Sequence, residues 1–327
     1  MRNINNSWIA KGYVDESIGD IDVVAEITKL KKEKNAVLMA HYYQQSEIQD
    51  IADIIGDSLA LAQKAVNIDA KIILLAGVHF MGETVKILNY DKKVLVPDLN
   101  AGCSLAESCQ YEDFKSFINE HPGYKVVSYV NTSAAVKSIT DVVVTSSNAL
   151  KIIKSFPVDE KIIFGPDRNL GSYINSQTGR NMILWDGACH VHEKFSLEQI
   201  LALKEQNPDA QIISHPECKK QIILVSDFVG STAALLSYVG QSDCEKFIVA
   251  TEFGILHQMQ KMYPNKQFIP APPIDSTCGC NNCEYMKLNT LEKIYLTLKY
   301  EWPEIQIDED LAKAARLSID NMLELSK

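Results

Sequence analysis

The chain has 327 residues, of which 46% are hydrophobic and 23% charged, and its formal net charge is −10 at pH 7. This composition is typical of a globular protein with two or three domains, and the negative charge argues against a general nucleic-acid-binding protein. No apolar run reaches the roughly 20 residues that span a membrane, and the N-terminus lacks an apolar signal-peptide core. We therefore expect a cytoplasmic protein, with no membrane partner, whose eight cysteines are mostly reduced.

Strands alternate with helices along the chain, which indicates parallel βαβ units. The strand expected at 71–76 is apolar from Ile72 to Ala76, as suits a strand buried on both faces of its sheet. After a lead-in at 1–20, the first elements expected are a helix over 22–34, a strand over 35–40, a helix from about Glu47, a helix over 59–66 and the strand over 71–76.

The pattern occurs three times, with constant internal spacing. In each copy an aspartate (Asp53, Asp141, Asp227) lies five residues before a residue with a hydroxyl side chain. A residue at the end of a strand lies seventeen residues before the same hydroxyl residue. The repeat predicts an α/β protein of three pseudo-symmetric three-layer domains with parallel sheets. The expected boundaries are 21–115, 116–195 and 196–290, followed by C-terminal helices of unknown packing at 291–327.

Polar residues gather where the first strand of each copy ends. Functional residues of parallel sheets lie at the carboxyl ends of strands, and the helix starts that follow favour anions. For each hydroxyl the alternative is an ordinary helix N-cap. The strand-end residues are His41, Tyr43, Tyr129, Asn131, His215 and Glu217, and the hydroxyls expected to open helices are Ser58, Ser146 and Thr232.

Each copy also ends in a strand followed by a cysteine loop, and these loops offer Cys103, Cys189 and Cys283 at comparable places. Three thiolates could bind zinc or a [4Fe–4S] cluster, but the short spacings of structural zinc sites are absent from two of the loops. A cluster held by three cysteines leaves one iron open as a Lewis acid. The spacing leaves open whether Cys278 and Cys280 are spare thiols, a redox pair or alternative ligands. Inert buried thiols are expected at Cys109, Cys218 and Cys244.

These segments together resemble the quinolinate synthase family, iron–sulfur enzymes of de novo NAD biosynthesis. The resemblance covers roughly residues 35–290, and one departure is Glu284, where the family often has proline after its last ligand cysteine. The motifs are AHYYQ at 40–44, DIIGDS at 53–58, AGCS at 101–104, SYVNT at 128–132, VTSSN at 144–148, CHVHE at 189–193, HPEC at 215–218, GST at 230–232 and CEYMK at 283–287.

The resemblance implies that iminoaspartate condenses with dihydroxyacetone phosphate to give quinolinate, phosphate and water, and that L-aspartate oxidase or aspartate dehydrogenase supplies the imine. It implies that the three domains surround a central [4Fe–4S] cluster site held by Cys103, Cys189 and Cys283, whose open iron binds the iminoaspartate-derived part. It also ties Tyr43 and Glu217 to acid–base steps. We expect Glu217 to be the general base and the catalytic residue His215 beside it to bind or polarise an oxygen. The substrate-contacting positions that the resemblance implies are His41, Ser58, Tyr129, Asn131, Ser146, His215, Glu217 and Thr232.

Three other functions remain open at the level of sequence. An iron–sulfur hydro-lyase acting on a hydroxy-acid would share the three-cysteine cluster, a redox or iron sensor would not need the polar strand ends, and a sugar-phosphate-binding protein would leave the cysteine loops unexplained. His192, three residues after Cys189, either lines the pocket or only hydrogen-bonds its loop.

Overall fold

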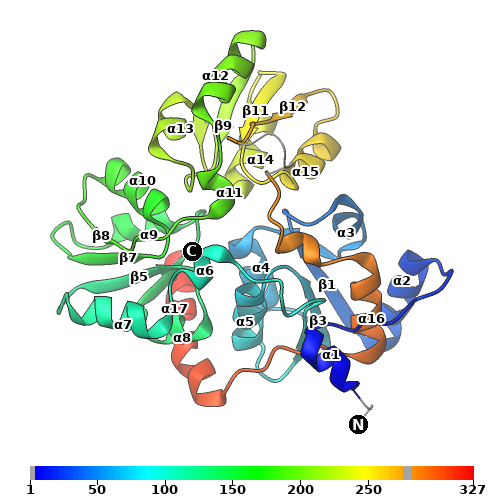
Figure 1. The fold of residues 1–327 in the computed structure, drawn as a ribbon. Coiled ribbons are helices and arrows are strands. Elements are labelled where there is room, and N and C mark those ends of the chain that lie inside the picture. The colour runs from blue at the N-terminus through cyan, green and yellow to red at the C-terminus, as the bar shows by residue number, and fades with distance from the viewer. Residues whose placement is uncertain (1–3, 275–280) are drawn as a thin grey trace.

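The computed structural model describes residues 4–274 and 281–327, which form three α/β units around a common centre (Figure 1). Each unit has a parallel four-stranded sheet, and the strand order is the same in all three: second, first, third and fourth strand of the unit. The predicted fold class is confirmed. The expected domain boundaries remain a prediction, because no feature of the fold fixes where one unit ends.

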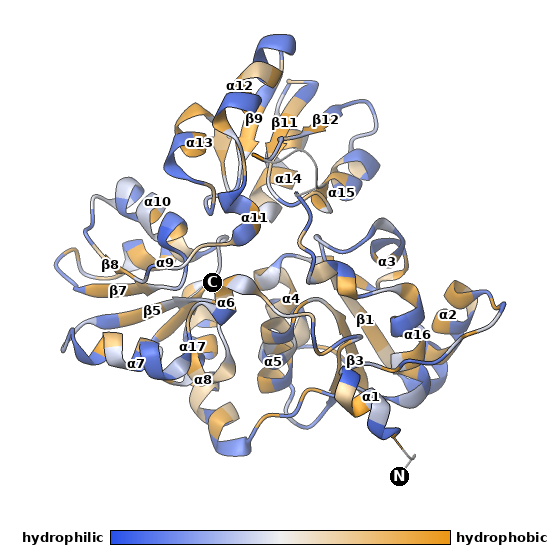
Figure 2. Ribbon diagram, in the orientation of Figure 1, coloured by the Kyte–Doolittle hydropathy of each residue, from blue (hydrophilic) through white to orange (hydrophobic). Residues whose placement is uncertain are grey.

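The strands are short, and most of their residues are buried, in keeping with the apolar runs seen along the strands in Figure 2. The first sheet contains β1 (Ala36–His41), β2 (Ile54–Gly56), β3 (Ile72–Ala76) and β4 (Lys93–Leu95); the second contains β5 (Lys125–Tyr129), β6 (Val142–Val144), β7 (Ile162–Gly165) and β8 (Ile183–Leu184); the third contains β9 (Gln211–Ser214), β10 (Phe228–Val229), β11 (Lys246–Ala250) and β12 (Gln267–Pro270).

Helices connect the strands, and further helices precede the first sheet and follow the third. In chain order they are α1 (Asn6–Lys11), α2 (Val23–Lys34), α3 (Ser46–Ile51), α4 (Ser58–Ala65), α5 (His79–Leu88), α6 (Ser104–Glu107), α7 (Tyr111–Asn119), α8 (Ala134–Ser138), α9 (Ala149–Ser155), α10 (Arg168–Thr178), α11 (His190–Glu193), α12 (Leu197–Gln206), α13 (Lys220–Val225), α14 (Thr232–Gln241), α15 (Ile255–Met262), the 3₁₀ turn η1 (Met286–Leu288), α16 (Leu291–Tyr300) and α17 (Glu309–Leu325).

The repeated aspartates explain why the spacing in the sequence is constant. Each carboxylate accepts a hydrogen bond from a backbone N–H of the first strand in its own unit, which ties the loop before the second strand to that strand. The pairs are Asp53 with Leu38 N at 2.8 Å, Asp141 with Val126 N at 2.7 Å and Asp227 with Ile212 N at 2.7 Å.

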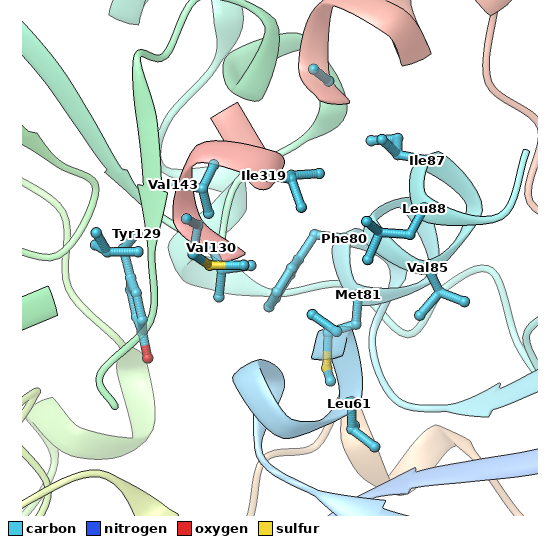
Figure 3. Close-up of a cluster of buried hydrophobic side chains, with 14 of the residues drawn as sticks. Leu61, Phe80, Met81, Val85, Ile87, Leu88, Tyr129, Val130, Val143 and Ile319 are labelled. Carbon is cyan, nitrogen blue, oxygen red and sulfur yellow. The ribbon is translucent and has the colours of Figure 1, made fainter. Parts of the chain in front are cut away.

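The first two units share one hydrophobic core, whereas the third unit has cores of its own. Figure 3 shows Phe80 of the first unit facing Val130 and Val143 of the second and Ile319 of α17, with Leu61 further along the same cluster. Helix α17 packs on α8 and β6 of the second unit and on α5 of the first, while α16 packs on α2. Helix α17 therefore joins the first two units, whereas α16 packs on the first.

One detail of the expected helix starts is wrong. Ser58 and Thr232 begin α4 and α14, but α9 begins at Ala149 rather than at Ser146. The reason is that the Asn148 side chain accepts a hydrogen bond from Thr145 N at 2.6 Å, so a turn comes before the helix. The N-caps of α4 and α14 are the residues before the hydroxyls, Asp57 and Ser231, which leaves the Ser58 and Thr232 hydroxyls without a capping role.

A core substitution tests the packing. Leu74 is fully buried in the first sheet, so Leu74→Ala is expected to lower the free energy of unfolding by about 2–5 kcal/mol through lost burial and the cavity left behind. The matched control is Leu224→Ala, because Leu224 is 73% exposed and should cost less than about 0.5 kcal/mol. Urea denaturation measures both, and equal values would contradict the assigned core.

Within residues 4–274 and 281–327, no helix combines the length and the apolar character needed to cross a bilayer.

Candidate active site

A single pocket lies where the three units meet, and all the predicted site residues line it. It is placed by the sheets: His41 and Tyr129 are the last residues of β1 and β5, and His215 follows β9 directly. The three cysteines and the hydroxyls of Ser58, Ser146 and Thr232 line the same pocket. The structure therefore brings together residues that are up to about two hundred and forty positions apart in the chain.

The buried histidines His41 and His215 are held in the same way. His41 Nδ1 accepts a hydrogen bond from Tyr43 N at 3.1 Å, and His215 Nδ1 lies 3.4 Å from the donating Glu217 N. A ring nitrogen that accepts carries no proton, so each neutral imidazole has its proton on Nε2. His215 Nε2 lies 3.1 Å from Ser146 Oγ, and both rings can therefore donate a hydrogen bond on the pocket side.

Burial lowers the pKa of both His41 and His215 to about 3. Between an unfolded-state pKa of about 6.5 and these folded values, the unfolded chain takes up protons that the folded chain does not. The free energy of unfolding contributed by these two groups therefore falls as the pH drops from about 6.5 towards 3. At neutral pH both rings are uncharged donors.

We expect both histidines to remain neutral at pH 5.5, where a histidine of ordinary pKa is largely protonated. The measurement is nitrogen NMR of protein labelled with ¹⁵N-histidine and prepared without added iron, with His41→Gln and His215→Gln variants used to assign the signals. For each residue we expect the signals of a neutral ring, with a protonated Nε2 and an unprotonated Nδ1. A doubly protonated ring at either position would contradict the geometry.

Glu217 is the centre of the polar network. Glu217 is only 3% exposed. Its carboxylate accepts a hydrogen bond from the Tyr129 hydroxyl and lies 3.1 Å from His192 Nδ1. Burial raises the pKa of Glu217, but His215, His192 and the Tyr129 hydroxyl outweigh it and hold the pKa below its ordinary value. Glu217 is therefore an ionised carboxylate, able to accept a proton.

Tyr43 reaches this network through hydroxyl groups of the third unit. Its phenol lies 2.8 Å from Thr232 Oγ1 and 2.9 Å from Thr251 Oγ1, and Thr251 Oγ1 is 3.1 Å from His192 Nε2. Burial, with the charge of Glu217, raises the pKa of Tyr43 well above its usual value. Tyr43 is therefore a protonated phenol, suited to donating a proton or a hydrogen bond.

His192 lines the pocket, which answers the question that the sequence left open. Its ring stacks on His215 with centroids 4.8 Å apart, and its nitrogens face Thr251 and Glu217. Thr251 and the pocket residue Glu252 were not predicted from the sequence. The signal that could have found them is their position, because two polar residues follow the buried strand β11 at its carboxyl end.

The three cysteines occupy the same place in the repeat, although their spacing in the sequence varies. In each unit, a backbone N–H just after the third strand donates to the carbonyl two residues before the cysteine. The pairs are His79 N with Ala101 O at 2.7 Å, Arg168 N with Gly187 O at 2.8 Å and Phe253 N with Asn281 O at 2.9 Å.

Each thiol also faces backbone N–H groups two or three residues further on, which would favour a thiolate. The donors are Leu105 and Ala106 for Cys103, His192 for Cys189, and Tyr285 and Met286 for Cys283. Burial nevertheless raises the pKa of each thiol, to about 11 for Cys103 and about 12 for Cys283. A metal bound to these thiols would lower their pKa and favour the thiolate.

The lining of the pocket contains several side chains that can bind a metal. Among the described residues, one group offers three ligand atoms within 4.8 Å of one another, namely Cys189, His192 and Glu217. Cys103 and Cys283 line the same pocket. Thiolates of this kind suit zinc or an iron–sulfur cluster.

The other cysteines differ from one another. Cys109 and Cys218 are buried, as expected for inert thiols, but Cys244 is only partly buried, so that prediction is wrong for it. Cys244 lies in the turn just before β11, where its thiol faces the carbonyls of Asp209 and Lys246. Cys278 and Cys280 lie outside the described residues.

Comparison with known proteins gives a consistent result. Residues 25–324 match the family described as quinolinate synthetase A protein. A quinolinate synthase of Thermosynechococcus vestitus is 55% identical over 306 residues, which cover 94% of this chain and 96% of the relative. Those of Chloroherpeton thalassium and Synechocystis sp. are 52% and 55% identical, over 95% and 93% of this chain and 97% and 96% of the relatives.

Proposed function

The chain belongs to the quinolinate synthetase A family and is an enzyme of NAD biosynthesis, and we propose that its pocket condenses iminoaspartate with dihydroxyacetone phosphate. The products are quinolinate, phosphate and water. The observation that carries the proposal is the convergence of one cysteine and one set of polar strand-end residues from each of three repeats on a single pocket. A cytoplasmic location remains a prediction.

We assign Cys103, Cys189 and Cys283 as the ligands of a [4Fe–4S] cluster. The support is their equivalent backbone setting and their place in one pocket. When bound, the cluster would supply a Lewis acid at an iron that no cysteine holds. Asn131 lies beside this part of the pocket, with Nδ2 3.9 Å from Cys103 Sγ. Its buried Oδ1 has no hydrogen-bond partner among the described groups, so it is free to accept one from a substrate.

Glu217 is the general base in this proposal. An ionised, buried carboxylate can remove a proton from a carbon of the triose, and Tyr129 fixes its position by donating to it. Tyr43, a buried phenol with a raised pKa, then returns a proton to a leaving hydroxyl. Thr232 and Thr251 orient that phenol from the third unit.

The remaining polar groups bind the substrates. His41 donates from Nε2 to a substrate oxygen, and His215 donates from Nε2 to Ser146 Oγ, since backbone N–H groups occupy their Nδ1 atoms. Ser58 and Thr232 stand at the first residues of α4 and α14, where unpaired backbone N–H groups and the helix dipole favour carboxylate or phosphate. Ser146 extends the same set from the second unit and is placed by His215.

The test is a product assay under anaerobic conditions. Protein reconstituted with iron and sulfide is supplied with dihydroxyacetone phosphate and with iminoaspartate made in place by an aspartate-oxidising enzyme, because the imine is unstable. Quinolinate and phosphate are expected in equal amounts. A hydro-lyase would release no phosphate from this mixture, and that result would reject the proposal in favour of the alternative iron–sulfur enzyme.

A further inference from the structure

Two buried carboxylates lie at equivalent places in the repeat, immediately behind two of the cluster cysteines. Two residues after the third strand of each unit stand Val78, Asp167 and Glu252. All three side chains are buried, with Asp167 fully inaccessible and Glu252 1% exposed. Burying a carboxylate is costly unless hydrogen bonds compensate it, so the partners of these two groups indicate their role.

Asp167 ties the loop of Cys189 to a helix start. Its Oδ2 accepts a hydrogen bond from Cys189 N at 3.2 Å, and its Oδ1 accepts one from Leu170 N at 2.7 Å, as the N-cap of α10. One oxygen is therefore fixed on the scaffold, while the other holds the backbone of the ligand residue itself.

Glu252 makes the same kind of tie in the third unit. Its Oε1 accepts a hydrogen bond from Cys283 N at 3.1 Å, and its Oε2 accepts one from Gly254 N at 2.6 Å. Lys287, four residues after the cysteine, places its ammonium 3.1 Å from Oε1 and also donates to Tyr43 O at 2.6 Å. The carboxylate thus joins the Cys283 loop to the end of β11.

The first unit has no carboxylate at the equivalent position, which Val78 occupies. There, the loop of Cys103 has the shared backbone bond from His79 N to Ala101 O. The cysteine loops are therefore held unequally, two by a backbone bond plus a carboxylate and one without the carboxylate. A hydrogen bond to the N–H of the ligand residue fixes the direction of its Cα–Cβ bond, and hence of its thiolate.

We propose that Asp167 and Glu252 are positioning residues, which orient the thiolates of Cys189 and Cys283 toward the cluster and slow its loss. This inference rests on the proposed cluster. Groups behind metal ligands typically change metal affinity by about 10- to 100-fold when they are removed, and we expect an effect of that size on the rate of cluster loss.

The first part of the experiment uses protein without iron. Asp167→Leu and Glu252→Met keep similar volume and remove the acceptors, and amide hydrogen exchange is followed at Cys189 and Cys283. Exchange is expected to accelerate about tenfold or more at Cys189 only in the first variant and at Cys283 only in the second, so each variant is the control for the other. Unchanged exchange at both cysteines would overturn the proposal.

The second part follows the loss of the visible cluster band to an iron chelator. Both variants are expected to lose it about 10- to 100-fold faster than wild type, and Glu252→Gln, which keeps one acceptor, is expected to fall between. The control is Asp227→Leu in the third unit. This change removes the hydrogen bond that the Asp227 carboxylate accepts from Ile212 N on β9, and the variant should lose the cluster at the wild-type rate.

The outcomes separate this inference from the proposed function. A wild-type protein that holds no cluster would refute the cluster assignment, while the exchange data would still decide whether the two carboxylates fix the cysteine backbones. A wild-type protein that holds its cluster, together with variants that lose it at the wild-type rate, would overturn the positioning role alone. Should Asp167→Leu fail to fold, Glu252→Met and Glu252→Gln carry the test.

Discussion

Glu217→Gln should lower the turnover number for quinolinate by about 10²- to 10⁴-fold, the range that a general base contributes, while the cluster remains loaded. The amide keeps the shape of the side chain and still accepts a hydrogen bond from Tyr129, so the pocket should stay assembled. It cannot take a proton from carbon at neutral pH. The change should therefore appear in the turnover number rather than in iron content or thermal stability.

The control for this variant is Glu193→Gln. Glu193 is also a glutamate of the same region, but it pairs with Arg168 and Lys219 and does not line the pocket. We expect its turnover to stay close to that of wild type. Steady-state assays of quinolinate formation decide the matter, and wild-type turnover in Glu217→Gln would refute the assignment of Glu217 as the base.

Cys103→Ala, Cys189→Ala and Cys283→Ala should each lose both the cluster and all measurable quinolinate formation. The reason is that each residue is the cluster ligand assigned to its unit, and no other described cysteine lines the pocket. Iron and sulfide are determined after anaerobic reconstitution. Full cluster content in any one of the variants would remove that residue from the ligand set.

Cys109→Ala is the matched control for the cysteine series. Cys109 is buried in an apolar cluster with Phe114 and Val126, away from the pocket, so its loss should cost some stability but no iron. A variant without iron here would mean that cluster loading responds to general damage. The three ligand variants would then no longer identify ligands.

The repeat was predictable because its spacing reflects local contacts. The aspartate that precedes each hydroxyl accepts a hydrogen bond from the first strand of its own unit, so the offsets cannot vary without breaking that bond. The cysteine offsets vary more, since the loops before the cysteines differ in length. Their equivalence emerges only from the backbone bonds that fix each loop two residues before its cysteine.

Other features depend on contacts that a sequence pattern does not contain. The amphipathic pattern of α17 is compatible with many partners, and its place across the first two units follows from the core they share. The start of α9 depends on one side chain, Asn148, which turns the chain before the helix. Thr251, Glu252 and Asp167 carry no motif, and their importance arises from being buried and polar beside the site.

The most direct test of this account is the metal content and visible spectrum of wild-type protein purified without oxygen. We expect four irons and four sulfides for each chain, as in a [4Fe–4S] cluster, with a broad absorption near about 400–420 nm. A colourless protein with one zinc and no iron would contradict it, because the three thiols would then serve a different metal from the one the pocket was assigned.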